Sequence, residues 1–181
     1  MNEISYLAET AAHDHEIEDI NAEAFGPGRF ARAAYKIREG GPHERPLSFV
    51  ATHDGRVIAT VRLTRIAVGE GRSLLLGPLA VRPSHKDLGI GRGLVRIAIE
   101  AAREAGWASV ILVGDEPYYG PLGFRQVPIG RITMPRPVDY RRLLIHEIDA
   151  GALETLTGEM RHADLVSEPS IGNVERIAAT A

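Results

Sequence analysis

Apolar residues occur along this chain in two patterns, one typical of strands and one typical of helices. Short runs rich in Val, Ile, Leu and other apolar residues predict strands over residues 4–7, 48–52, 57–66, 73–81, 109–113, 124–128 and 141–148. Apolar residues at helical spacing predict helices over 11–25, 29–38 and 91–105. Strand, helix and strand follow one another over 74–113, which predicts a right-handed crossover between two parallel strands. The pattern therefore predicts a mixed α/β fold.

The stretch 74–94 interrupts this pattern at two points. Pro78 lies inside an otherwise apolar strand and has no N–H to donate, so it predicts a bulge that parts this strand from its parallel neighbour. Gly89 and Gly91 then form a turn at the start of the next helix. Free amides and the helix dipole favour an anion at such a position, which predicts a ligand that carries phosphate.

The turn between the strands 48–52 and 57–66 contains His53 and Asp54, which could be mistaken for a catalytic pair. Asp54-Gly55 is a strong hairpin signal, because both central positions of such a turn need positive φ. We therefore assign the pair to a hairpin. His85 is expected to be structural or exposed, and the seven histidines show no metal-ligand spacing, so no metal is predicted.

The pattern weakens after residue 149. Residues 152–160 are expected to form a helix, whereas 167–181 carry no clear core pattern. We therefore divide the chain into one domain over 1–150 and a C-terminal extension over 151–181. The extension is expected to be helical or to act as an arm that completes a homodimer.

Composition narrows the class of protein. The chain has 181 residues, 44% of them hydrophobic and 25% charged, as in an ordinary globular domain. A formal net charge of -3 argues against a protein that binds nucleic acid by broad phosphate neutralisation. No apolar run approaches the roughly 20 residues that span a bilayer, and no signal peptide is recognisable. We expect a cytoplasmic protein with neither nucleic acid nor membrane as partner.

Two motifs resemble a known family. The turn Lys86-Asp87-Leu88-Gly89-Ile90-Gly91 resembles the pyrophosphate-binding signature Arg/Gln-x-x-Gly-x-Gly/Ala of the GCN5-related N-acetyltransferase (GNAT) superfamily. The segment Tyr119-Gly120-Pro121-Leu122-Gly123-Phe124 resembles that family's Tyr-x-x-x-Gly-Phe segment, and the likeness covers residues 4–148. The resemblance implies the GNAT fold, in which helices flank a mixed, mostly antiparallel sheet with a V-shaped splay between two parallel strands.

The resemblance implies acetyl-CoA as co-substrate. Amides at the helix start would hold the pyrophosphate, and the strand edge after Pro78 would pair with the pantetheine arm. The implied cofactor-binding residues are Leu79, Ala80, Val81, Lys86, Asp87, Leu88, Gly89, Ile90, Gly91, Arg92 and Tyr119. The chain departs from the family pattern at two positions, with Lys86 at the leading Arg/Gln position and Leu112 where many members have Asn.

The resemblance also implies a role for Tyr119, which would protonate the departing CoA sulfur; the alternative is a core aromatic with its hydroxyl at the surface. Asp115 or Glu116 could accept the amine proton, although Asp115 could equally cap the short helix that follows. Lys86, Arg92 and Arg96 could meet the phosphates or be solvated surface residues. With no cysteine in the sequence, a thiol intermediate is excluded.

These observations predict an N-acetyltransferase that moves acetyl from acetyl-CoA to a primary amine of a small molecule or peptide. One alternative is a non-catalytic acyl-CoA-binding module with the same fold; another is a nucleotide-binding domain that uses the glycine turn. The acceptor stays open, because the acidic helix 11–25 favours a cationic amine and the basic helix 29–38 an anionic one.

Overall fold

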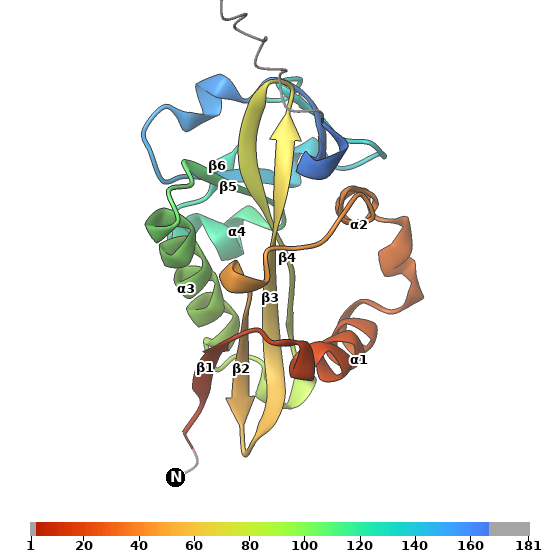
Figure 1. Cartoon of the computed structure of the whole chain (residues 1–181), viewed down its shortest axis with the longest axis vertical. Coiled ribbons are helices and arrows are strands. Elements are labelled where there is room, and N and C mark those ends of the chain that lie inside the picture. Colours follow the sequence, from red (N-terminus) through yellow and green to blue (C-terminus); the bar gives the residue numbers. More distant parts are fainter. Residues whose placement is uncertain (1–2, 167–181) are drawn as a thin grey trace, which may run out of the picture.

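The computed structural model describes residues 3–166. A central sheet has the strand order β1-β2-β3-β4-β5-β8-β6, and β9 pairs with both β3 and the short β7 (Figure 1). The β4–β5 and β7–β9 pairs are parallel and the other pairs are antiparallel, which confirms the predicted mixed, mostly antiparallel sheet. The strands are β1 Ser5–Ala8, β2 Phe49–His53, β3 Arg56–Val68, β4 Gly71–Val81, β5 Ser109–Val113, β6 Arg125–Gln126, β7 Ile132–Thr133, β8 Leu143–Glu147 and β9 Gly158–His162.

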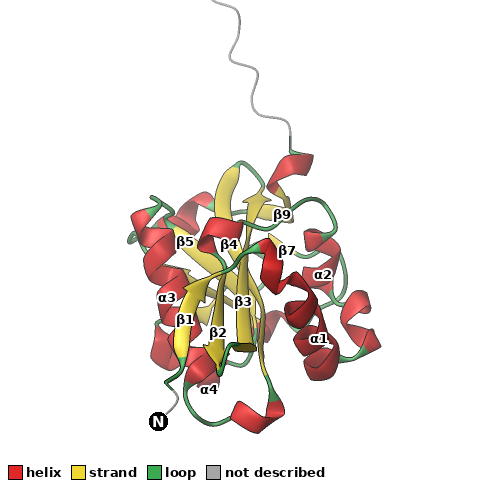
Figure 2. Cartoon of the chain, turned by 60° about the horizontal axis from the view of Figure 1, so that its bottom comes forward, coloured by secondary structure: helices red, strands yellow, loops and turns green. Residues whose placement is uncertain are grey.

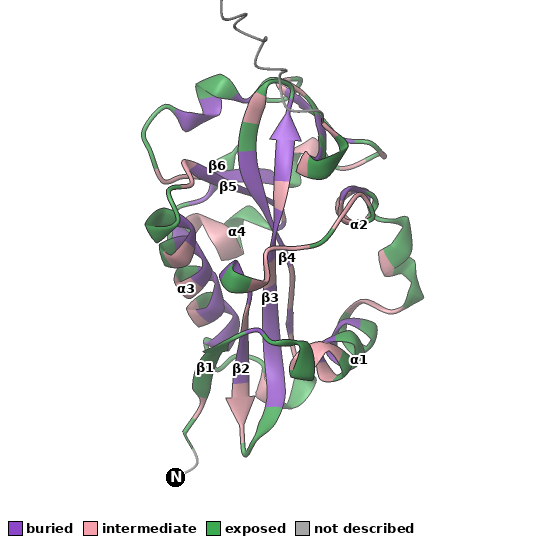
Figure 3. Cartoon of the chain, in the orientation of Figure 1, coloured by how far each residue is buried: buried purple, intermediate pink, exposed green. Residues whose placement is uncertain are grey.

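Helices cover both faces of the sheet (Figure 2). Helix α3 (Ile90–Glu104) packs on one face, where its apolar residues join the largest buried cluster. Helices α1 (Asp14–Phe25) and α2 (Ala33–Arg38) pack on the other face, and the single turn α4 (Glu116–Tyr119) follows β5. Burial is concentrated in the strands and in the inner sides of the helices (Figure 3). The helix predicted over 29–38 is interrupted at Arg32, whose backbone is extended.

The strand β4 carries the predicted bulge. Leu76 pairs with Leu63 and Leu79 pairs with Val61, so Gly77 and Pro78 together lie opposite the single residue Arg62. Before the bulge, β4 pairs with β5 through Leu74 and Leu75; within the described chain, residues 76–81 have no partner on β5. The two parallel strands therefore splay apart after residue 75, as the sequence predicts.

The prediction of a helix over 152–160 is wrong. Ala152–Thr155 form a 3₁₀ turn, and Gly158–His162 form β9, which pairs with the end of β3. Leu153, Leu156 and Met160 imitate a helical period, but all three are buried beside β3, and Gly158 has φ +109°, which a helix does not accommodate. Residues 167–181 lie outside the described part, and the predicted homodimer arm stays a prediction.

Candidate active site

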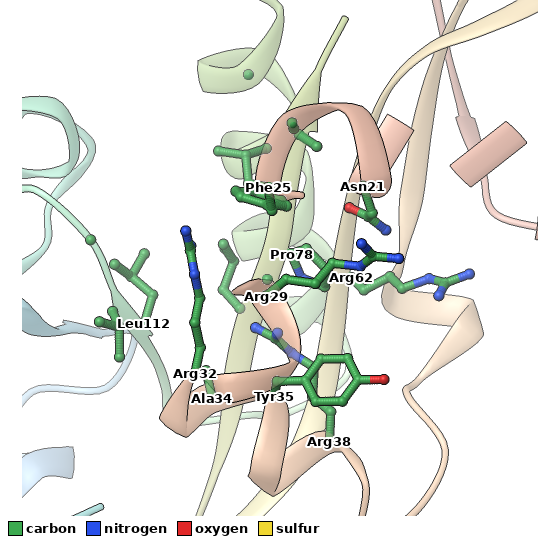
Figure 4. Close-up of a pocket in the computed structure, with 18 of the residues that line it drawn as sticks. Asn21, Phe25, Arg29, Arg32, Ala34, Tyr35, Arg38, Arg62, Pro78 and Leu112 are labelled. Atoms are coloured by element: carbon green, nitrogen blue, oxygen red, sulfur yellow. The ribbon is translucent and has the colours of Figure 1, made fainter. Parts of the chain in front are cut away.

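The splay opens into a cleft of about 1300 Å³. Its walls are the α1–α2 segment on one side and the β4, α3 and α4 segments on the other (Figure 4). Ten of the eleven residues that the resemblance implies for cofactor binding line this cleft, and so does Asp115. Leu88 does not line it, and the residue is 62% exposed.

The glycine turn has the backbone geometry that an anion site needs. Asp87 and Gly89 have φ of 62° and 75°, and Gly89 directly precedes the first residue of α3. The first turn of α3 carries no acidic residue, so nothing on it neutralises the positive end of the helix dipole. At Gly91, a Cβ would lie 2.6 Å from the Tyr118 hydroxyl, so glycine is needed for the close approach of helix and cleft wall.

The basic side chains near this turn differ in position. Lys86 and Arg92 line the cleft, and the Arg92 guanidinium lies 5.1 Å from the centre of the Tyr118 ring. Arg96 lies one turn further along α3 and is not among the cleft residues. The geometry therefore favours Lys86 and Arg92 over Arg96 as side chains that could meet phosphate.

Tyr119 is held by packing and faces the same cleft. Its ring makes edge contacts with Tyr118 and Phe124, at centroid distances of 4.8 and 5.7 Å. A Cβ on Gly114 would overlap the Tyr119 ring, so this glycine makes room for it. Burial, reinforced by neighbouring Tyr118 and Asp115, raises the pKa of the Tyr119 hydroxyl well above its usual value. The phenol is thus protonated at neutral pH, as a general acid must be, and the same burial makes it a weaker acid than an exposed tyrosine.

Asp115 occupies the N-cap position of α4, as one of the two interpretations predicts, but its side chain makes no capping hydrogen bond. The residue precedes α4, and its main-chain carbonyl accepts from the amides of Tyr118 and Tyr119. Its carboxylate accepts a hydrogen bond from Arg142 Nε at 3.0 Å and is 72% exposed. Arg142 thus holds the Asp115 carboxylate at the rim of the cleft, where it stays open to solvent. Glu116, the other candidate base, is exposed and does not line the cleft.

A polar network behind the cleft is not predicted by the sequence pattern. The fully buried Glu9 carboxylate accepts hydrogen bonds from His43, Arg45 and Arg62, and His43 and Arg62 line the cleft. Burial alone would raise the pKa of Glu9, but the hydrogen bonds from His43 and Arg62 outweigh it, and the pKa is lowered. The partners are 34 to 53 positions apart, so no spacing in the sequence could reveal them.

The predicted hairpin is confirmed at Asp54 and Gly55, which both have positive φ. His53 Nδ1 lies 3.2 Å from His85 Nε2, and Ser84 Oγ lies 2.8 Å from His85 Nδ1.

Within residues 3–166 no group of three or more His, Asp or Glu side chains is placed to hold a metal ion. No helix in the same range has the length and apolar character needed to cross a membrane.

Comparisons with known proteins agree with this geometry. The family model described as "Acetyltransferase (GNAT) family" matches residues 14–122. The uncharacterized N-acetyltransferase YjhQ of Escherichia coli is 29% identical over 156 residues, covering 82% of this chain and 86% of YjhQ. The uncharacterized N-acetyltransferase YhbS of the same organism is 28% identical over 146 residues, covering 78% of this chain and 86% of YhbS.

Two solved structures have the same fold. The crystal structure of Escherichia coli YhbS in complex with CoA gives a TM-score of 0.76 at 24% identity, covering 90% of this chain and 91% of YhbS. A GNAT family acetyltransferase from Brucella melitensis in complex with acetyl-CoA gives a TM-score of 0.67 at 22% identity, covering 92% and 100%. At these identities the likeness shows the fold alone.

Proposed function

The chain belongs to the GNAT family of acetyltransferases, and from this premise we propose that it transfers acetyl from acetyl-CoA to a primary amine by direct attack. One observation carries the proposal. The edge of β4 that has no partner on β5, the glycine turn before α3 and Tyr119 all border a single cleft. The structural neighbours solved with CoA and with acetyl-CoA support the choice of co-substrate.

In this proposal the cofactor lies along the splay. The amides at the start of α3 bind the pyrophosphate, and Leu88 contributes through its backbone rather than its exposed side chain. Lys86 and Arg92 add positive charge at the same end. The peptide-like pantetheine pairs with the free edge of residues 79–81, which the bulge at Pro78 separates from β5.

The proposed reaction forms one bond and breaks one. The neutral amine nitrogen attacks the thioester carbonyl, a backbone amide of the free β4 edge stabilises the oxyanion, and a C–N bond forms. The C–S bond then breaks, its electron pair leaves with the CoA sulfur, and the Tyr119 hydroxyl supplies a proton to that thiolate. Asp115 is the proposed acceptor of the amine proton, directly or through a water, because its carboxylate lines the same cleft.

Replacement of the tyrosine hydroxyl tests the proposal. Tyr119→Phe keeps the ring packing and removes the acid, so CoA release with an accepted amine should fall by about 100-fold while CoA affinity is unchanged. Tyr6→Phe is the matched control, because Tyr6 is exposed on β1 and does not line the cleft. Equal rates for Tyr119→Phe and wild type would remove Tyr119 from the mechanism. Tight CoA binding with no transfer to any amine would favour the non-catalytic module.

A further inference from the structure

A band of polar side chains interrupts the apolar packing between the sheet and the α1–α2 segment. On one side of the band, Ile17, Ile20 and Val57 belong to one buried cluster. On the other side, Ile37 and Ile66 belong to another. Between these clusters, β3 directs three alternate residues toward the face of the sheet that α1 and α2 cover. They are Thr60, Arg62 and Thr64.

This band contains most of the buried polar atoms that lack a hydrogen-bond partner in the described chain. Four of the five such atoms are Asn21 Oδ1, Arg38 Nε, Thr60 Oγ1 and Thr64 Oγ1. The fifth, Arg65 Nε, lies 2.6 Å from the Glu44 carboxylate and is therefore paired in charge. Asn21, Arg38 and Thr64 line the cleft. Because buried polar groups are nearly always satisfied, unsatisfied groups gathered in one wall of a cleft indicate a ligand with polar groups of its own.

The charge of the band is positive. Arg38 and Arg32 form no ion pair with a carboxylate within residues 3–166, whereas Arg62 is paired with Glu9 and Asp14. Burial, together with the nearby charges of Arg32 and Arg62, lowers the pKa of Arg38 to about 10, so the group is still cationic at neutral pH. Figure 4 shows both unpaired arginines reaching from the α2 segment into the cleft.

The acidic face of α1 does not offset this charge. Only one of its acidic residues, Glu18, lines the cleft, and its carboxylate accepts from Arg29 at 2.7 Å. The others each have a partner of their own: Asp14 pairs with Arg45 and with the already paired Arg62, Glu16 accepts from the Val57 amide, Asp19 pairs with His15 and Glu23 pairs with Arg82. The structure therefore favours the anionic side of the alternative that the sequence left open.

The position of Arg38 separates it from the expected phosphate end of the cofactor. A Cβ on Gly77 would lie 2.7 Å from Arg38 Nη2, so the guanidinium packs on the β4 bulge. Gly77 precedes Val81 by four strand residues, or about 13 Å, and the glycine turn lies further on. Arg38 thus lies at the end of the cleft opposite the glycine turn, beyond the strand edge proposed for pantetheine.

We propose that Arg38 and Arg32 bind an anionic group, a carboxylate or a phosphate, of the amine acceptor. The substrate class is then a small primary amine that carries such a group, as a free amino acid does. The planar guanidinium matches both anions through paired N–H donors, and an incoming anion compensates a cation that the protein itself leaves unpaired. The inference rests on the proposed function, because it identifies the acceptor of that same reaction.

The test compares two product analogues that differ in charge. N-acetylglycine and N-acetylglycinamide are titrated into the CoA-saturated protein by calorimetry, after CoA binding itself has been measured. We expect N-acetylglycine to bind at least about 10-fold more tightly than the amide, as the loss of a hydrogen bond to a charged group requires. Arg38→Met should abolish this difference. Arg32→Met should reduce it, and because Arg32 is exposed, that variant keeps the test valid if Arg38→Met fails to fold. Arg56→Met, at the remote β2–β3 hairpin, is the matched control.

The results separate the two proposals. If CoA does not bind, the proposed function fails. If CoA binds but the acid and the amide bind equally, or neither binds, only the anionic acceptor is overturned. A difference that survives in both Arg38→Met and Arg32→Met also overturns it. A CoA-release assay with glycine, glycinamide and phosphoethanolamine then distinguishes carboxylate from phosphate, with transfer to glycinamide alone counting against the inference.

Discussion

His43 Nε2 lies 2.7 Å from the carboxylate of Glu9, although the two residues are 34 positions apart in the chain. Glu9 also accepts hydrogen bonds from Arg45 and Arg62, and its side chain is fully buried. One carboxylate therefore ties the strand end at residue 9 to the loop before β2 and to β3. Because His43 and Arg62 also line the cleft, this network supports one of its walls.

Glu9→Gln should destabilise the fold by about 2 kcal/mol at pH 7, because it removes the buried carboxylate shared by His43, Arg45 and Arg62, while Asp14 still pairs with both arginines. The pKa of Glu9 is lowered below its ordinary value of 4.5, so its contribution is complete above about pH 4.5 and is lost as the pH falls through the folded-state pKa. Urea unfolding of both proteins from pH 7 to about pH 3 measures the difference. A difference that does not shrink at low pH would show that Glu9 acts by packing alone.

Gly91→Ala should weaken CoA binding by about 10-fold, by analogy with overpacking costs of one to a few kcal/mol. The new methyl group meets the Tyr118 hydroxyl, which must move within the cleft, and it also touches Leu79 and Val81 on the strand edge proposed for pantetheine. Gly28→Ala is the control, because a Cβ there meets nothing within 4 Å. Calorimetric titration with CoA measures the affinity of each variant. Equal affinities would show that the start of α3 does not bind the cofactor.

Asp115→Asn should lower kcat by about 100-fold if Asp115 accepts the amine proton. Arg142→Gln breaks the same 3.0 Å pair but leaves the carboxylate in the cleft, so its rate should fall much less. The two variants are compared by CoA release across pH. Similar losses in both would mean that the ion pair positions α4 and that another group takes the proton.

Two truncated chains test which residues after 149 contribute to the stability of the fold. A chain ending at Val166 retains β9 and should unfold at nearly the wild-type temperature. A chain ending at Asp149 loses Leu153, Leu156 and Met160, all of which are buried, and should be destabilised by several kcal/mol, at roughly 2–5 for each large side chain. Thermal unfolding followed by circular dichroism makes the comparison, with size-exclusion chromatography reporting the oligomeric state of each form. A stable chain of 149 residues would support the division at residue 150.

The sequence predicts the β4 bulge and the glycine turn at the start of α3, because the signals for both are local. Pro78 inside a strand and two glycines at a helix start each carry their conformation in a few residues. The Glu9 network and the unsatisfied Arg38 depend on contacts between distant segments, so they are visible only in the folded chain. The error at β9 has a related cause, since Leu153, Leu156 and Met160 fit a helical period and only pairing with β3 makes the segment a strand.

The bulge at Gly77-Pro78 also determines which way every later side chain of β4 points. Before it, even-numbered Leu74 and Leu76 face α3; after it, odd-numbered Leu79 and Val81 do so. If Gly77 and Pro78 each paired with a residue of β3, with no bulge, Leu79 and Val81 would turn to the opposite face, where Ala80 now packs against α1. The bulge thus absorbs one extra residue, so the apolar side chains before and after it pack against the same helix while the strand parts from β5.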